Sequence, residues 1–254
     1  MRNLLVRFVL AAALAAPLAG QQAAGPQPKS QKELDQLLAI QNAPDPQTRI
    51  DASQKLLTDF VDTDFKEFAN FNIMLAYQQL NDFENMLIFG ERTLQLNPDN
   101  VGALLQLAYA IPTRTREFDL DKEEKLSRAE DYGKRALTLV PNMEKPNPQI
   151  ADDEWLLSKK DFMAQAHEAL GQIELKRENF PQAEEHFREA LNVTPQQNSS
   201  TFYHLANALE KQGKKDEALT TVNKSIELAT AEGAGSSHVL NAANELKAKL
   251  EQGS

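Results

Sequence analysis

The sequence predicts an all-α fold built from stacked helical hairpins. An alanine, in one case replaced by methionine, recurs early in five apolar-periodic stretches, at Ala52, Met86, Ala129, Ala183 and Ala218. The first and last spacings are 34 and 35 residues, and the two middle spacings, 43 and 54, exceed 34 by 9 and 20. Three of these stretches end twelve residues later in a proline, at Pro98, Pro141 and Pro195. A period near 34 with two insertions is typical of a helical solenoid.

Composition narrows the classes of function. The chain has 254 residues, is 41% hydrophobic and contains only 10 glycines, which suits a helical core. It has no cysteine, so disulfides, thiolate metal sites, a cysteine nucleophile and a lipidated cysteine are all excluded. Its net charge of −10 argues against nucleic-acid binding, which needs a basic face.

The first twenty residues are typical of a secretory signal peptide. Arg2 and Arg7 precede an apolar run from Phe8 to Ala19, which is too short to span a bilayer comfortably. We therefore predict cleavage near Gly20, a periplasmic or secreted mature protein of net charge −12, and no membrane insertion after cleavage. An uncleaved anchor is the weaker alternative. Residues 21–29 are rich in proline and glutamine and are expected to be a disordered linker.

Helical hairpins are expected from residue 30 to residue 252. Ser30 and Glu33 form a predicted capping box at the start of the first helix. Trp155 lies in the extension of a later repeat helix, and we expect its side chain to pack that extension onto the array. Prolines at 112, 141, 146 and 148 predict an inserted loop over Pro112–Asp119 and an irregular segment after Pro141, and 233–237 is expected to be a flexible break. The predicted units are 30–64, 67–100, 101–141 with the inserted loop, 152–197 with an extended first helix, and 199–230, followed by a capping helix at 238–252.

The segment from Ala164 to Pro195 resembles a tetratricopeptide repeat. The family's large, small and aromatic positions are occupied by His167, Leu170-Gly171, Glu174, Ala183, Phe187, Ala190 and Pro195. The next unit repeats the pattern, whereas the earlier units depart from it, with Met74 and Met86 at small positions and Gly90 and Gly133 at an aromatic position. This resemblance implies a right-handed α-solenoid of such hairpins with terminal capping helices.

The resemblance also implies a concave groove lined by the first helix of each unit. Carried onto this sequence, the groove positions are Phe68, Phe71, Leu75, Gln78, Leu105, Tyr109, Glu168, Gln172, Tyr203 and Asn207. An apolar part followed by a polar, acidic part suits an extended peptide or a partner helix. Phe68 and Phe71 could instead pack on the N-terminal helices, and Tyr203 and Asn207 could be covered rather than exposed.

We therefore expect a non-enzymatic protein-interaction scaffold that binds a peptide or helix of another envelope protein. No catalytic, cofactor-binding or metal-ligating constellation is recognisable, because the four histidines have no metal spacing and no phosphate loop is present. Glu168 and Gln172 stand where related groove clamps carry Lys and Asn, so no carboxylate clamp is expected. The polar loop Pro112–Asp119 is a further possible contact point. A self-associating structural subunit of an envelope assembly is the alternative, and an enzyme is a distant third.

Overall fold

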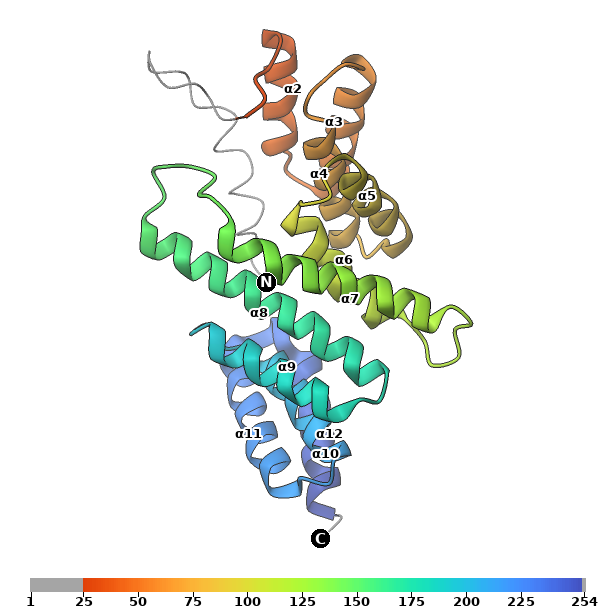
Figure 1. The fold of residues 1–254 in the computed structure, drawn as a ribbon, viewed down its shortest axis with the longest axis vertical. Helices are drawn as coiled ribbons and strands as arrows, with labels where there is room; N and C mark the ends of the chain where they lie inside the picture. Colours follow the sequence, from red (N-terminus) through yellow and green to blue (C-terminus); the bar gives the residue numbers. More distant parts are fainter. Residues whose placement is uncertain (1–24, 253–254) are drawn as a thin grey trace. The chain divides into compact units, whose positions relative to one another are not determined.

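The computed structural model describes residues 25–252, which are helical and contain no strand (Figure 1). They form two compact units. Unit 1 comprises the described residues up to 107 together with 143–155, and unit 2 comprises 108–142 and the described residues from 156 onward. The predicted signal peptide and residues 21–24 of the predicted linker lie outside the described residues. The prediction of an all-α fold of stacked hairpins is confirmed.

Unit 1 contains α2 (Gln31–Gln41), α3 (Pro46–Asp59), α4 (Lys66–Gln79), α5 (Phe83–Leu96) and the first half of α6 (Val101–Arg114). Side-chain oxygens of Ser30, Asp45 and Asp82 accept hydrogen bonds from backbone N–H groups of α2, α3 and α5, which explains where these helices begin. The side chains of α4 are buried from Ala69 to Ala76 without interruption, because α3 and α5 both contact this helix. The core of unit 1 is therefore formed around α4.

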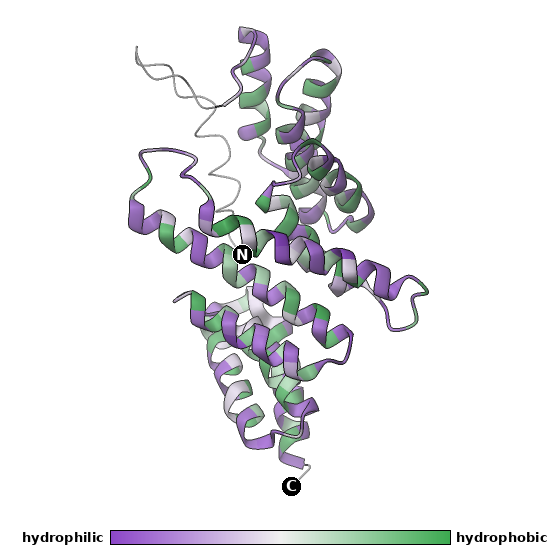
Figure 2. Cartoon of the chain, viewed as in Figure 1, coloured by the Kyte–Doolittle hydropathy of each residue, from purple (hydrophilic) through white to green (hydrophobic). Residues whose placement is uncertain are grey.

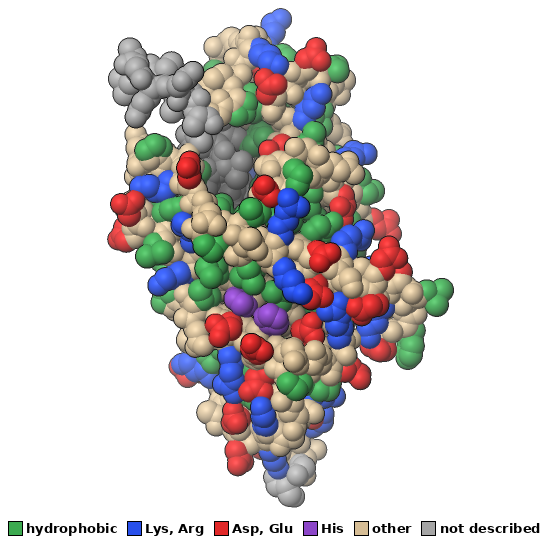
Figure 3. Space-filling model, in the orientation of Figure 1, with side chains coloured by type: hydrophobic (Ala, Val, Ile, Leu, Met, Phe, Trp, Pro, Cys, Tyr) green, Lys and Arg blue, Asp and Glu red, His purple; other side chains and the backbone are tan. Residues whose placement is uncertain are grey.

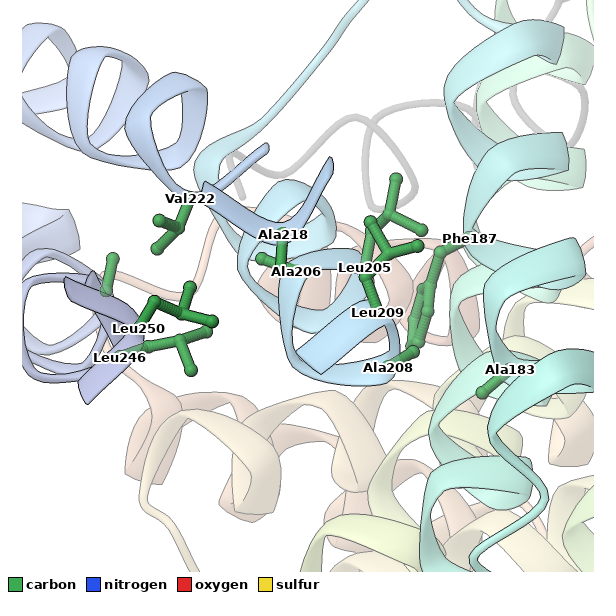
Figure 4. Close-up of a cluster of buried hydrophobic side chains, with 11 residues drawn as sticks. Ala183, Phe187, Leu205, Ala206, Ala208, Leu209, Ala218, Val222, Leu246 and Leu250 are labelled. Atoms are coloured by element: carbon green, nitrogen blue, oxygen red, sulfur yellow. The ribbon is translucent and has the colours of Figure 1, made fainter. Parts of the chain in front are cut away.

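Unit 2 contains the second half of α6, α7 (Lys122–Leu139), most of α8 (Asp152–Lys176), α9 (Phe180–Val193), α10 (Ser199–Lys211), α11 (Lys215–Glu232) and α12 (Ser237–Gln252). Its core surrounds Phe187, against which Leu205, Leu209 and the small residues of α9, α10 and α11 are gathered (Figure 4). Leu246 and Leu250 of α12 close this cluster at its end, as expected for a capping helix. Hydrophobic and hydrophilic residues alternate along these helices (Figure 2), and no helix among residues 25–252 is long and apolar enough to cross a membrane.

Glycines allow the closest helix contacts. A Cβ atom at Gly171 would lie 2.7 Å from the Phe187 ring, and one at Gly90 would lie 2.7 Å from Leu107. Gly133 receives Leu170 in the same way, at 3.1 Å. Each of these positions lacks a side chain because a large residue of the neighbouring helix fills its space.

Carboxylates join consecutive hairpins through a recurring hydrogen bond. Glu33 accepts from the Thr63 hydroxyl at 2.6 Å, Glu67 accepts from the amides of Asn97 and Asn100, and Glu168 accepts from Asn198 and Thr201. The partners are 30 or 33 residues apart, slightly less than one repeat of 34. We call these contacts hairpin latches, because each ties the first helix of one hairpin to the segment that begins the next.

Several local expectations are corrected. Helix α6 continues through Pro112 to Arg114, so the connection to α7 spans 115–121 rather than Pro112–Asp119. A proline in the last turn removes one hydrogen bond without ending the helix at once. The expected break at 233–237 is a 3₁₀-helix (η2, Gly233–Ser236) that leads directly into α12.

Two N-terminal contacts and the tryptophan segment also differ in detail from expectation. Ser30 caps α2 as predicted, but Glu33 accepts from the backbone N–H of Lys29 and from Thr63 instead of from Ser30 itself. Lys29, the last residue of the expected linker, also donates to the carbonyl of Asp62 and is therefore tied to unit 1. The irregular segment after Pro141 is held by Trp155, whose indole N–H donates to the carbonyl of Met143 at 3.3 Å.

Candidate partner-binding surface

The predicted groove residues occupy equivalent positions on successive first helices. The pairs Leu107-Ala108, Leu170-Gly171 and Leu205-Ala206 share one place in the repeat, so Tyr109, Gln172 and Asn207 are equivalent to one another. By the same spacing Leu105, Glu168 and Tyr203 are equivalent. Of these six residues only Leu105 belongs to unit 1, and the other five belong to unit 2.

In unit 1 most of the predicted groove residues are buried. Phe71, Leu75 and Leu105 have exposed fractions of 2%, 5% and 2%. The Phe71 ring packs on Gly102, where an added Cβ would lie 2.6 Å from the ring. Phe68 is half-buried, and Gln78 is exposed and hydrogen-bonds to Gln106. In this structure only Phe68 and Gln78 among these five present a sizeable surface.

In unit 2 three predicted residues come together. Tyr109 of α6 hydrogen-bonds to Gln172 of α8, which is buried, and both lie close to Glu168. Burial raises the pKa of the Tyr109 hydroxyl, and the nearby Glu168 carboxylate adds to the rise while the hydrogen bond from Gln172 opposes it. Tyr109 is therefore a neutral phenol that joins α6 to α8 and keeps part of its ring at the surface.

Glu168 has a structural role that the sequence did not indicate. Its Oε1 atom accepts from Asn198 at 2.8 Å and from the Thr201 hydroxyl, so it forms the hairpin latch between α8 and α10. Burial raises the pKa of this carboxyl group, and no cation pairs with it among the contacts of the described residues. The 33-residue spacing to Thr201 is the signal that could have revealed this contact.

Tyr203 and Asn207 lie one turn apart on α10 and are both partly exposed. The Tyr203 ring packs edge-on against His204 at a centroid distance of 5.2 Å, and His204 stacks on Phe187. Asn198 caps the N-terminus of α10, because its side-chain oxygen accepts from the backbone N–H of Thr201, and its amide nitrogen donates to Glu168. Tyr203 and Asn207 are thus partly accessible side chains on a firmly held helix.

A histidine pair lies in the same unit. His167 of α8 and His186 of α9 approach with their Nδ1 atoms 3.3 Å apart and their ring centroids 5.6 Å apart, an end-on contact in which one nitrogen donates and the other accepts. Burial lowers the pKa of both rings, so the pair is neutral at pH 7. Histidine side chains reach the surface on the face drawn in Figure 3. Within residues 25–252 no group of three or more histidine and acidic side chains is arranged to hold a metal ion.

The comparisons with known proteins agree with this geometry. The model of the tetratricopeptide repeat family matches residues 162–231. The resemblance to this family is thereby confirmed for that segment. The match covers α8 from Phe162 onward, α9, α10 and nearly all of α11, the region where the small positions and Phe187 follow the family pattern most closely. No curated protein matches the chain.

Solved structures with the same fold cover most of the chain. MamA (residues 41 to the end) from Desulfovibrio magneticus RS-1 is 14% identical and has a TM-score of 0.58, with 81% of this chain and 99% of that chain covered. TTC0263, a thermophilic tetratricopeptide repeat protein of Thermus thermophilus, is 18% identical, with a TM-score of 0.54 over 83% and 98% of the two chains. PilW, a type IV pilus biogenesis factor, is 16% identical, with a TM-score of 0.55 over 88% and 94%. The prediction of a tetratricopeptide-repeat solenoid is therefore confirmed.

Proposed function

We propose that this protein is an exported, non-enzymatic scaffold that binds an extended segment or a helix of another envelope protein. The observation that carries the proposal is the arrangement in unit 2. Tyr109, Gln172 and Asn207 stand at equivalent positions on consecutive first helices, and Tyr203 lies one turn before Asn207 on α10. Tyr109, Tyr203 and Asn207 keep part of their surface exposed. Such side chains offer flat apolar contact and hydrogen bonds without large losses of conformational entropy.

The frame behind these side chains supports a binding role. The latch at Glu168 and the hydrogen bond between Tyr109 and Gln172 tie α6, α8 and α10 to one another. A surface that is ordered before binding loses less entropy when a partner docks. Phe71, Leu75 and Leu105 are removed from the proposed contacts because they are buried, whereas Phe68 and Gln78 remain candidates on unit 1.

The chemistry of unit 2 is consistent with a scaffold. Its partly buried acidic side chains already have partners: Glu130 and Glu174 pair with Arg177, Glu184 pairs with Lys214, and Glu168 forms a latch. Such contacts account for these carboxylates through stability alone. Because these carboxylates are already engaged within the fold, we place the binding role on the partly exposed tyrosine and asparagine side chains.

The experiment for the groove is a pair of matched double variants. Tyr203→Ala with Asn207→Ala removes two groove side chains of α10, while Tyr132→Ala with Asn223→Ala removes the same residue types from the second helices α7 and α11. A partner is first identified by crosslinking in the native envelope with mass spectrometry and is then purified. The groove variant should bind it at least about tenfold more weakly than wild type, as expected for a tyrosine hot spot. Equal losses in both variants, or none in the groove variant, would contradict the proposal.

Export is tested separately. Removal of residues 1–20 should leave a mature chain that begins near Gln21 and is recovered from the periplasm or the medium. Terminal sequencing of the fractionated protein measures this directly. A chain that retains Met1 to Gly20 in the cytosolic fraction would remove export from the proposal and leave the groove untouched. Light scattering on the mature protein tests the alternative of self-association, because a monomer at all concentrations would exclude it.

A further inference from the structure

The connection between α6 and α7 exposes two large apolar side chains. Phe118 is 93% exposed and Leu120 is completely exposed, the two highest values among the large hydrophobic residues described. In Figure 3 hydrophobic side chains stand out at the right-hand edge, where this connection lies in Figure 1. An isolated exposed leucine is ordinary, but two such residues at neighbouring corners of one connection are not explained by packing.

The connection consists of two successive tight turns. The backbone N–H of Asp119 donates to the carbonyl of Arg116, and the N–H of Lys122 donates to the carbonyl of Asp119. Phe118 is therefore a corner residue of the first turn and Leu120 a corner residue of the second. Corner side chains of a tight turn point away from the turn, so the backbone itself directs both apolar groups outward.

Polar groups around these turns hold them in place. The Asp119 carboxylate accepts from the Arg116 backbone N–H and pairs with Lys125, and Lys122 pairs with Glu117 at 3.0 Å. At the base, Thr115 is buried and its carbonyl accepts from Lys176 of α8 at 2.9 Å. The apolar corners are thus presented on a segment that is ordered before any partner arrives.

The charges next to the apolar pair indicate what can cover it. Glu117 and Asp121 adjoin Phe118 and Leu120, and their side chains are 57% and 53% exposed. The lysines that pair with them, Lys122 and Lys125, are only 20% and 34% exposed. The exposed Arg116 lies close enough to Asp119 to lower the pKa of its carboxyl group, so one cation accompanies these carboxylates. Residues 116–124 contain five carboxylates and two basic side chains, so the surface around the pair is predominantly acidic. This charge opposes insertion into an anionic membrane and contact with a second copy of this acidic chain.

We propose that residues 116–122 form a docking loop that inserts Phe118 and Leu120 into an apolar pocket rimmed by basic side chains on a partner protein. The docking loop is separate from the groove residues of the proposed function, and its contribution does not depend on them. Asp119 acts as a positioning residue, because it closes the first turn without facing the partner.

The test begins with a photo-crosslinking residue, benzoylphenylalanine, in place of Leu120 in the native host. The adduct is identified by mass spectrometry and its protein component is purified for binding measurements by fluorescence anisotropy. Phe118→Ser with Leu120→Ser should weaken binding by about tenfold or more. Leu156→Ser, which removes another exposed leucine of unit 2, should change it less than about twofold. Circular dichroism should show the same helical content in all variants.

Two further measurements separate the mechanism from its alternatives. Glu117→Lys with Asp121→Lys should weaken binding and reverse its salt dependence, while Asp119→Ala should weaken it with both apolar residues still present. The proposal is overturned if the adduct at position 120 is a second copy of this chain. It is equally overturned if wild type, but not the serine variant, floats with phosphatidylcholine–phosphatidylglycerol vesicles, or if the serine variant binds the purified partner as tightly as wild type.

Discussion

Units 1 and 2 build the same helical hairpins with different kinds of side chain. In unit 1, α4 is buried over a whole stretch from Ala69 to Ala76, and the fold depends on apolar packing and helix caps. In unit 2 the helices bury one face, and charged networks cover the other: Arg177 pairs with Glu123, Glu130 and Glu174. All four histidines also belong to unit 2. We therefore expect unit 1 to respond mainly to changes of volume and unit 2 to changes of volume and of pH.

The glycine contacts show that the large and the small residue of a helix contact can be distributed between the two helices in two ways. In the clearest repeat of unit 2 the first helix has Gly171 and the second has Phe187. In unit 1 the second helix has Gly90, and Leu107 of the following helix fills the space. Gly133 and Leu170 repeat the second arrangement within unit 2. The hairpin therefore requires one large and one small residue at each contact, and either helix can supply the large one.

The largest expected effect separates the two units energetically. Phe187→Ala removes a fully buried ring from the core of unit 2 and should lower its free energy of unfolding by about 4 kcal/mol. Trp155, the only tryptophan, belongs to unit 1, so its fluorescence reports that unit, whereas circular dichroism reports all helices. In urea the dichroism midpoint should fall more than the fluorescence midpoint.

The matched change in unit 1 is Met74→Ala, which removes a fully buried side chain from α4 and should cost about 2–5 kcal/mol. It should shift the Trp155 transition first. If either variant moves both transitions by the same amount, the units unfold as one cooperative body and the energetic contrast is lost.

The next effect tests the volume rule at the glycines. Gly171→Ala would place its Cβ 2.7 Å from a rigid aromatic ring and should cost about 1–3 kcal/mol, less the roughly 1 kcal/mol that alanine contributes to the helix. Gly133→Ala meets the flexible end of Leu170 at 3.1 Å, so its two terms should nearly cancel. Thermal unfolding of both variants gives the comparison, and equal stability would contradict the idea that ring rigidity decides the cost.

Much of the fold was predictable because close helix packing demands small residues at a regular spacing. Ala183 and Ala218 have exposed fractions of 0% and occupy equivalent places in consecutive hairpins, as the 35-residue spacing implied. The volume exchange at Gly90 and Gly133 was not predictable, since it depends on a leucine one helix further along the chain. The end of α6 was also missed, because a proline in a last turn leaves the helix intact for a few residues.

The candidate surface was only partly predictable, for a related reason. Periodicity shows that Tyr109 and Gln172 share a position, and the structure joins them by a hydrogen bond. It cannot show which neighbours cover that position, so the burial of Leu75 did not follow from the sequence. Packing of Phe71 on the N-terminal helices was an alternative from the sequence, and the structure buries its ring against Gly102 of α6. The role of Glu168 as a latch depends on Thr201, 33 residues away, and appears only when both helices are in place.

Acid should weaken unit 2 before unit 1. Burial lowers the pKa of His167, His186 and His204, in the last case to about 4, so the folded unit binds fewer protons than the unfolded chain below the ordinary histidine pKa of 6.5. The stability of unit 2 is complete above pH 6.5 and should fall as the pH drops toward 4. Since the His204 ring is not fully enclosed, we expect a loss of about 1–2 kcal/mol rather than the full linkage value.

The measurement is urea unfolding at pH 7 and pH 5, followed by dichroism and by Trp155 fluorescence. His204→Leu should remove part of the pH dependence in the dichroism signal and leave the fluorescence signal as it is. Glu130 and Glu184 have lowered pKa values and stay charged through this range. Burial raises the pKa of Glu168 and Asp161, so their protonation works against the histidine effect, and the difference between wild type and His204→Leu isolates the histidine contribution. A pH response of equal size in both signals would remove the assignment to unit 2.

The smallest effect concerns the hairpin latches, where the two units differ in how the carboxylate is held. Glu168 has a raised pKa because burial disfavours its charge, so Glu168→Gln should keep the acceptor oxygen for Asn198 and Thr201 and remove the desolvation cost. We expect a gain of about 0.5–1 kcal/mol at pH 7, shrinking as the pH falls and the native carboxyl group becomes protonated. Glu168→Ala breaks the latch and should cost about 1–3 kcal/mol. Glu67→Gln is the counterpart in unit 1, where one carboxylate oxygen accepts from two asparagine amides. A stability gain there as large as at Glu168 would show that burial of the Glu168 carboxylate is not the reason why glutamine is favoured.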